Sequence, residues 1–272
     1  MESRLLETEA RVNLLASPTN VPVPVHGHYM YLDRHDSLAL SLHHTHEPFQ
    51  TEVVEGLVKP GDVVVDAGAH IGYYALIAAR RVGAQGRVLA FEPSPIANVL
   101  LRRNVMANGY SARTEIHEAA LHRARERVQF WTSEDGLAGG AVHHPGGGWA
   151  WQELAVDALA LDGVVPPGGR VDFVKMDIQG GEHAALAGMR RCLGDNPGVK
   201  LLLEFWPRGL IACGTTPEDL LAELERMGFG VRDVREDERA VVPTTAAELT
   251  ARYPRDGYGH TNLLCERGAP AR

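Results

Sequence analysis

Residues 58–93 constrain the fold of this chain more than any other stretch of its sequence. Three valines at 63–65 form a short β-branched run between turn signals, which is typical of a buried parallel strand. Asp66 ends the run, and Gly68 and Gly72 flank the turn that follows. A helix is expected at 71–82. The stretch therefore begins as a strand, a glycine turn and a helix.

A second strand is expected at 87–91, and Glu92 follows it directly. The whole stretch is then a βαβ unit, and open α/β sheets bind ligands at the carboxyl ends of such strands. The turn contains neither the phosphate loop GxxxxGK[ST] nor the dinucleotide fingerprint GxGxxG. An acid placed like Glu92 can accept two hydrogen bonds from a ribose diol. A nucleoside with a zwitterionic amino-acid tail fits both acids, and S-adenosylmethionine (SAM) is such a ligand.

Four motifs in order resemble the FkbM family of SAM-dependent methyltransferases. They are DAGAHIGYYALIAAR at 66–80, VLAFEPSP at 88–95 with Asn104 following, FVKMDIQGGEHAALAGM at 173–189 and LLLEF at 201–205. The resemblance runs from about His46 to Glu266. It implies a class I methyltransferase fold, which is Rossmann-like, and usually O-methylation of a hydroxyl on a sugar, a polyketide or a similar metabolite. The chain departs from the family at His70, where Asn is common, and at Gln179 and Gly181, where Glu and Ala are usual.

Strands alternate with helices along most of the chain, which favours a parallel, doubly wound α/β sheet. We expect seven strands in this mostly parallel sheet, with the last two forming a closing antiparallel pair. The further strands are expected at 113–120, 171–176, 199–205, 229–234 and 261–265, with 128–131 as an antiparallel addition, and the further helices at 96–108, 182–193 and 217–227. Residues 1–45 are expected to be an N-terminal extension of helix, linker and cap before a SAM-binding domain at 46–272.

Composition excludes several classes of protein. With 272 residues and 44% hydrophobic content, the chain can bury one substantial core. Its net charge of −8 argues against a nucleic acid as the main substrate. No apolar run approaches the ~18 residues that span a bilayer, and the acidic N-terminus lacks a signal-peptide core. The three widely spaced cysteines suit reduced packing residues. We therefore expect a cytoplasmic protein with no membrane partner, and the sequence leaves homo-oligomerisation open.

Two long connections are expected near the carboxyl edge of the sheet. Residues 132–151 contain six glycines without a period, so they are either a functional loop or a surface excursion. His143, His144, Trp149 and Trp151 of this loop can close over an acceptor. Residues 235–260 are charged and contain prolines, and they are expected to run over the same edge.

The cofactor contacts are assigned to residues at the ends of the first three strands. Asp66 and Gly68 would hold the methionine tail of SAM, with His70 and Gly72 in the same turn, and Glu92 would hold the ribose. The adenine would be bordered by Pro93, Ser94, Glu118 and Ala119. Glu47 has two interpretations, as a neighbour of the methionine end, which the resemblance implies, or as an acid stabilising a helix start.

The methyl acceptor needs a group that takes the proton of its hydroxyl. Asp177 ends the fourth strand of the sheet, where class I folds place the methyl group, and it is the first candidate. His260, at the carboxyl edge just before the last strand, is the second, because imidazole titrates near neutral pH. A divalent metal held by Asp177 and Glu204 is the competing mechanism, and we favour the metal-free one. Glu182 opens a helix, where an acid also stabilises the helix dipole.

Two functions from other classes share parts of this pattern. A nicotinamide-dependent (NAD) oxidoreductase would have the same sheet and ribose acid, but the third glycine and a Tyr/Lys or Cys catalytic pair are missing. A non-catalytic SAM-binding module would keep the glycine turn without needing Asp177 or a loop over the acceptor. Binding of SAM, NAD and ATP would distinguish the first function from methyl transfer, and turnover would distinguish the second.

Overall fold

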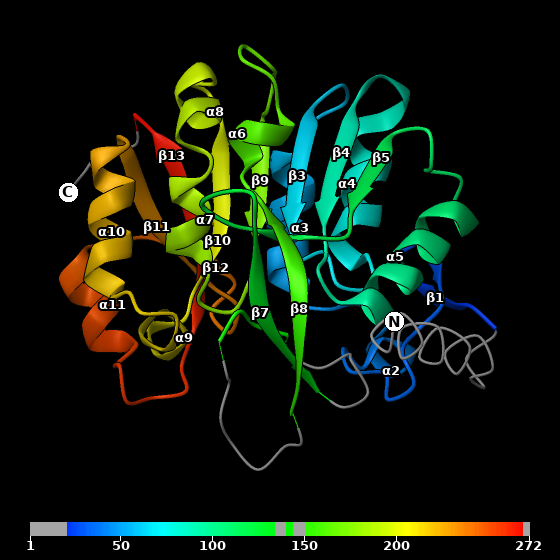
Figure 1. Cartoon of the computed structure of the whole chain (residues 1–272), viewed down its shortest axis with the longest axis horizontal. Coiled ribbons are helices and arrows are strands. Elements are labelled where there is room, and N and C mark those ends of the chain that lie inside the picture. Colours follow the sequence, from blue (N-terminus) through cyan, green and yellow to red (C-terminus); the bar gives the residue numbers. More distant parts are fainter. Residues whose placement is uncertain (1–20, 134–139, 144–150, 269–272) are drawn as a thin grey trace.

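A central eight-stranded sheet forms the middle of the molecule (Figure 1). The computed structural model describes residues 21–133, 140–143 and 151–268 of the chain. The strand order is β12-β11-β13-β10-β9-β3-β4-β5, and the five strands from β10 to β5 are parallel. Their bounds are β3 Val63–Ala67, β4 Arg87–Phe91, β5 Thr114–His117, β9 Phe173–Met176, β10 Lys200–Phe205, β11 Phe229–Arg235, β12 Ala240–Pro243 and β13 Thr261–Arg267.

The seven predicted strands are present, but the count of seven is wrong because β12 adds an eighth. β12 lies in the connection at 235–260 and pairs antiparallel with β11, with Pro243 opposite Arg232. An edge strand tolerates a proline that cannot donate to the ladder. The predicted closing pair is confirmed, since β13 is antiparallel to both β10 and β11.

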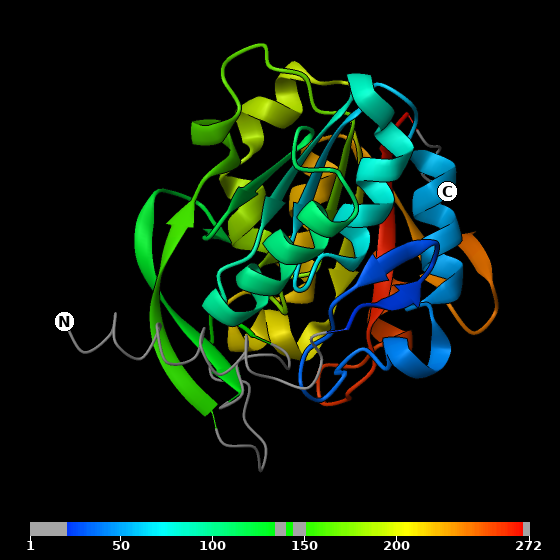
Figure 2. The same ribbon diagram turned by 90° about the vertical axis from the view of Figure 1, so that its right-hand side faces the viewer.

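The stretch at 128–131 does not join the central sheet as predicted. It belongs to β7 (Glu126–Ser133), which pairs with β8 (Trp151–Leu159) in a separate three-stranded sheet completed by β6 (Ala120–Leu121). The predicted third strand therefore ends early, at His117, and its last residues change sheets. β7 and β8 form a ribbon that stands away from the central sheet. It lies on the side opposite the hairpin of β1 (Val23–Val25) and β2 (His28–Met30) (Figure 2).

Helices cover both faces of the sheet because its strands are apolar on both sides. The side chains of Val64 and Val65, neighbours in β3, belong to two different cores. Helices α3 Pro48–Leu57, α4 Tyr73–Val82 and α5 Pro95–Ala107 pack on the Val64 side; α6 Leu161–Val164, α7 Glu182–Ala187, α8 Arg190–Asp195, α9 Pro207–Ala212, α10 Pro217–Arg226 and α11 Ala246–Arg252 contribute to the other. This two-sided burial is the doubly wound arrangement expected from the sequence. None of the helices in the described residues is both long and apolar enough to cross a membrane.

The single helix predicted at 182–193 is broken into α7 and α8. Gly188 lies at the break, and a Cβ there would be 2.0 Å from the carbonyl oxygen of His122. The chain turns at Gly188 because only glycine allows this approach. The remaining short elements are β1 Val23–Val25, β2 His28–Met30, α2 Leu40–His43 and the 3-10 helix η1 Gly83–Gln85.

Asn104 of α5 ties the described part of the N-terminal extension to the glycine turn. Its Oδ1 accepts from the backbone N–H of Tyr31 at 2.7 Å, and its Nδ2 donates to the carbonyls of Tyr31 at 3.0 Å and Ile71 at 2.8 Å. Asn108, one turn later, makes the same pair of contacts with the backbone of Tyr29 at a more exposed position. These contacts fix the segment against the domain. The predicted helix near the N-terminus lies outside the described residues.

We predict that Asn104→Ala lowers the free energy of unfolding by about 3 kcal/mol, because one buried and two partly buried backbone groups lose their partner. Asn108→Ala is the matched control and should cost only about 1 kcal/mol, since water can replace its contacts. Urea denaturation of the two variants measures the difference. Equal losses would show that Asn104 is not the tie that the geometry indicates.

Candidate functional site

A cavity opens at the carboxyl ends of β3, β4 and β9. Its floor comes from three segments that follow these strands: the glycine turn, the residues after β4, and the residues after β9. β7 and the residues at 140–142 close one side, and the segment before α3 closes another. The lining residues used below are Gly68, His70, Tyr74, Glu92, Pro93, Ser94, Phe130, Thr132, Lys175, Asp177 and Gln179, with Leu38 and His46 from the N-terminal segment. The cavity therefore lies where open α/β sheets bind ligands.

The glycine turn packs directly on the end of β9. Gly68 has φ 79°, and a Cβ there would be 1.9 Å from the carbonyl oxygen of Asp177. Gly72 has φ 98° and begins α4, where a Cβ would be 2.8 Å from Leu101. Gly68 lines the cavity, whereas Gly72 is absent from its described lining and shapes the turn. Gly68 thus allows the turn to approach the end of β9 closely, and Gly72 allows the chain to enter α4.

Glu92 fixes the glycine turn as well as facing the cavity. Its two carboxylate oxygens accept from the backbone N–H of His70 and of Ser94, each at 2.8 Å. The residue is 5% exposed, and burial raises the pKa of its carboxyl, against the effect of His70. A carboxylate has about four acceptor positions, so capacity remains for a ribose diol. Loss of Glu92 would therefore affect the turn along with any ribose contact.

Asp66 is a buried carboxylate whose oxygens are poorly satisfied by hydrogen bonds. It is 1% exposed, and neither oxygen accepts a hydrogen bond of normal geometry from the described residues. The N–H of Ala75 still stabilises its ionised form weakly. Burial raises the pKa of Asp66 to about 6, with Lys175 opposing the rise and Asp177 adding to it. Because buried polar groups normally have partners, Asp66 suits a cationic ligand group, reached directly or through water. Together with the glycine turn and Glu92, this fits the ammonium tail and ribose of SAM.

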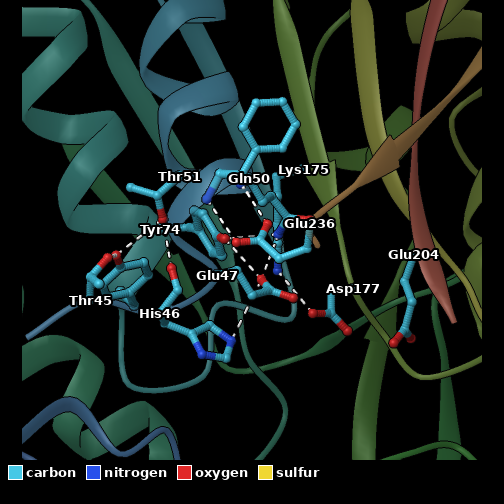
Figure 3. A network of polar contacts seen from close by, with 12 residues as sticks. Thr45, His46, Glu47, Gln50, Thr51, Tyr74, Lys175, Asp177, Glu204 and Glu236 are labelled. Carbon is cyan, nitrogen blue, oxygen red and sulfur yellow. Dashed lines mark hydrogen bonds and ion pairs between the residues drawn. The ribbon is translucent and has the colours of Figure 1, made fainter. Parts of the chain in front are cut away.

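Lys175 lies between Asp66 and Asp177. It is opposite Asp66 in the pairing of β9 with β3, and its Nζ is 3.3 Å from Asp177 Oδ2 (Figure 3). The ammonium group also lies 4.8 Å from the centre of the Tyr74 ring. Burial opposes the charge of Lys175, yet Asp177 and Asp66 hold its pKa above the usual value. Lys175 is therefore a buried cation shared by two carboxylates.

The carboxyl of Asp177 is partly buried, with 28% of the side chain exposed, yet its pKa is lowered. Burial works against its charge, but Lys175 and the amide of Gln179 outweigh this effect and lower the pKa of the carboxyl. The Nε2 of Gln179 lies 2.9 Å from Asp177 Oδ1, and also 3.3 and 3.1 Å from the two oxygens of Glu204. Burial and the charges of Asp177 and Glu182 raise the pKa of Glu204 well above its usual value. The pKa values of the two acids are thus shifted in opposite directions, downward for Asp177 and upward for Glu204.

Glu47 and Glu182, the remaining acids near this edge, accept hydrogen bonds from groups of the protein itself. Glu47 precedes α3, and its Oε2 accepts from Gln50 Nε2 at 2.6 Å and from the Tyr74 hydroxyl at 2.9 Å (Figure 3). The N-terminus of α3 is capped instead by Glu236, which accepts from two of its N–H groups. Glu182 accepts from the N–H of Ile178 at 3.0 Å, and burial raises its pKa to about 8. Glu47 does not appear in the described lining of the cavity, so its contact with SAM stays a prediction.

Four other predicted site residues, the buried Asp66 among them, are absent from the described lining of this cavity. His260 lies at the carboxyl edge, next to Thr261 at the start of β13, but it is exposed. Glu118 and Ala119 line a second cavity, beside β5 and β8, while Ala120 and Leu121 line the first. Their roles as base and as adenine neighbours stay predictions.

The loop predicted at 132–151 is partly ordered as strand. β7 extends to Ser133 and β8 begins at Trp151, while Ala141 pairs with Trp131. His143 is buried, with its Nδ1 3.1 Å from Cys213 Sγ. Thr132 of the loop and Phe130 just before it line the cavity, and closure of the loop over an acceptor stays a prediction. His144 and Trp149 lie outside the described residues.

Sequence reasoning missed His46, Lys175 and the bridging amide of Gln179. The sequence contained a signal for Lys175, a lysine within the apolar strand 173–176. Residues two apart in a strand point to the same face, so Lys175 is expected on the same face as Asp177. Nothing local marked His46, whose place depends on the fold of the N-terminal segment. The described part of the chain contains no cluster of three or more His, Cys, Asp or Glu side chains placed to hold a metal ion.

We predict that SAM binding weakens below about pH 6, because protonation of Asp66 removes the charge that the ammonium tail requires; the loss should approach about tenfold per pH unit. SAM binding should also release a proton. Calorimetry between pH 5 and about 7.5 in buffers of different ionisation enthalpy measures both effects.

The control is Asp66→Asn, which should bind SAM more weakly throughout and lose most of the pH dependence. A wild-type affinity that stays constant down to pH ~5 would contradict the assignment of Asp66. An identical pH profile in Asp66→Asn would assign the titration to another group.

Several solved structures are similar to this chain at low sequence identity. A putative rRNA methylase from Clostridium thermocellum shares 15% identity, with 82% of this chain and 95% of that chain covered and a TM-score of 0.49. A putative methyltransferase from Streptococcus mutans, solved in complex with SAH, shares 9% identity over 80% and 96% of the two chains, with a TM-score of 0.48. A SAM-dependent methyltransferase from Aquifex aeolicus shares 17% over 80% and 90%, with a TM-score of 0.45. A search of curated proteins found no match.

The model of the methyltransferase FkbM domain matches residues 66–231. This range begins at the buried acid of the glycine turn and includes Glu92, Lys175, Asp177 and Glu204. The match extends over more than half of the chain and over the cavity floor described above. The chain therefore belongs to the FkbM methyltransferase family, and it is a SAM-dependent methyltransferase.

Proposed function

We propose that the protein transfers the methyl group of SAM to a hydroxyl oxygen of a small metabolite, such as a sugar, a polyketide or another natural product. The observation that carries this proposal is Asp177, an ionised carboxylate that lines the cavity beside the glycine turn. A carboxylate in this position can accept a hydrogen bond from a hydroxyl and later its proton.

When bound, SAM supplies an electrophilic methyl group on its sulfonium. Asp177 orients the acceptor hydroxyl, whose oxygen forms the new bond to carbon as the bond from carbon to sulfur breaks. The hydroxyl becomes acidic as this bond forms, so its proton passes to the Asp177 carboxylate and then to water. Lys175 keeps Asp177 ionised before the step. Positioning in line and exclusion of water supply the rest of the acceleration.

The character of the cavity supports a small acceptor. Aromatic and aliphatic side chains form part of the cavity lining, among them Leu38, Tyr74 and Phe130. Among the described lining residues, Lys175 is the only lysine or arginine. Asp177 already neutralises its charge. A chain with a net charge of −8 and this lining gives phosphate groups little attraction. This supports a metabolite rather than a nucleic acid as the acceptor.

We predict that Asp177→Asn lowers turnover by about 10²- to 10⁴-fold while SAM affinity changes little. Comparative mass spectrometry of metabolite extracts, with and without enzyme, should find the acceptor by the mass of one added CH2 group. The isolated product then gives the turnover of each variant and shows whether the methyl group is on oxygen.

His260→Ala is the comparison variant and should retain most of the turnover. Loss of turnover in His260→Ala with retention in Asp177→Asn would move the proton acceptor to the histidine. A methyl group on nitrogen or carbon of the product would overturn the O-methylation proposal.

A further inference from the structure

The side chain of Gln179 lies between two carboxylates from neighbouring strands. Asp177 follows β9, and Glu204 lies near the end of β10. Both accept from the same nitrogen, Nε2 of Gln179, at 2.9 Å for Asp177 Oδ1 and at 3.1 and 3.3 Å for the oxygens of Glu204. Three carboxylate oxygens therefore converge on one point.

The turn that carries Gln179 holds this side chain firmly. Gln179 has φ 55°, a left-handed conformation that costs free energy in a residue other than glycine. Gly180 has φ 98°, and a Cβ there would be 2.3 Å from the backbone of Gly209 in α9. Glu182 closes the turn through the N–H of Ile178. The strained backbone is thus fixed by packing on both sides of Gln179.

Carboxylates that converge on one point need a group of positive character between them. Oxygen-rich sites of this kind are the sites that Mg²⁺ and Mn²⁺ prefer. A side-chain NH2 group carries two N–H donors and no lone pair available for a metal. It can therefore satisfy both carboxylates while it fills the place that a cation would take.

We propose that Gln179 is a positioning residue whose amide nitrogen takes the place of a divalent cation between Asp177 and Glu204. Glu204 holds the amide in place by accepting from its Nε2. The amide in turn orients the carboxylate of Asp177 toward the cavity. The aiming of Asp177 toward an acceptor hydroxyl rests on the function proposed above. The cation-like place of the amide does not, since it follows from the geometry alone.

The test is Gln179→Glu, which replaces the N–H donors with oxygen and leaves three carboxylates around one point. We expect this variant to bind one Mn²⁺ per chain, at least about tenfold more tightly than the wild type. Titration calorimetry with MnCl2 measures binding, and Mn²⁺ should also raise the thermal stability of the variant. The double variant Gln179→Glu/Glu204→Gln is the control and should lose this binding.

A folded Gln179→Glu protein that binds Mn²⁺ no better than the wild type would overturn the proposal, as would a wild type that binds Mn²⁺ equally tightly. If Gln179→Glu does not fold, Gln179→Ala decides, because it empties the place. Mn²⁺ binding above wild type supports the proposal, and its absence overturns it. These readouts need neither SAM nor acceptor, so failure of hydroxyl methylation would leave them standing.

The positioning role has its own readout once the acceptor is known. Gln179→Ala should lower kcat by about tenfold or more, while KM for SAM stays within about threefold. An unchanged kcat would contradict the role in aiming Asp177.

Discussion

The contact between Gly68 and the backbone carbonyl of Asp177 holds the two halves of the site together. A Cβ at Gly68 would be 1.9 Å from that oxygen, so no other residue allows β3 and β9 to end side by side in this way. The N–H of Asp177 also donates to the carbonyl of Ala67 at 3.0 Å. As a result, the glycine turn that suits the cofactor and the acid that suits the acceptor occupy one edge at a fixed separation.

Burial and neighbouring charges shift the pKa values of the acids at this edge in different directions. Asp177 is ionised because Lys175 and Gln179 compensate it, whereas Glu204, which lacks a cation of its own, has a raised pKa. Asp66 titrates at about 6 and shares Lys175 with Asp177. A cation bound at Asp66 would therefore change the electrostatic environment of Asp177. Asp66 and Asp177 are thus linked through one buried lysine.

Local signals in the sequence were sufficient to place the first two strands of the central sheet and the glycine turn between them. The β-branched run before Asp66, the glycines of the turn and the acid after β4 are properties of short contiguous stretches, and each lies where it was expected. The strand β12 was missed although it pairs with the preceding strand β11 in a hairpin. The sheet formed by β6, β7 and β8 was missed because it depends on distant pairings such as that of Ala120 with Ala158. The break at Gly188 depends on the approach of His122 from far along the chain. Gln179 stood out as a departure from the family pattern, but its bridging contacts required Glu204 to be placed beside it.

The most direct test of this account is the structure of the protein with S-adenosylhomocysteine bound. The account predicts that the ribose hydroxyls contact Glu92, that the ammonium group lies near Asp66, directly or through water, and that the sulfur faces the side of the cavity that Asp177 lines. An adenosine placed against Asp177, or a ribose without contact to Glu92, would contradict the division of the cavity into a cofactor half and an acceptor half.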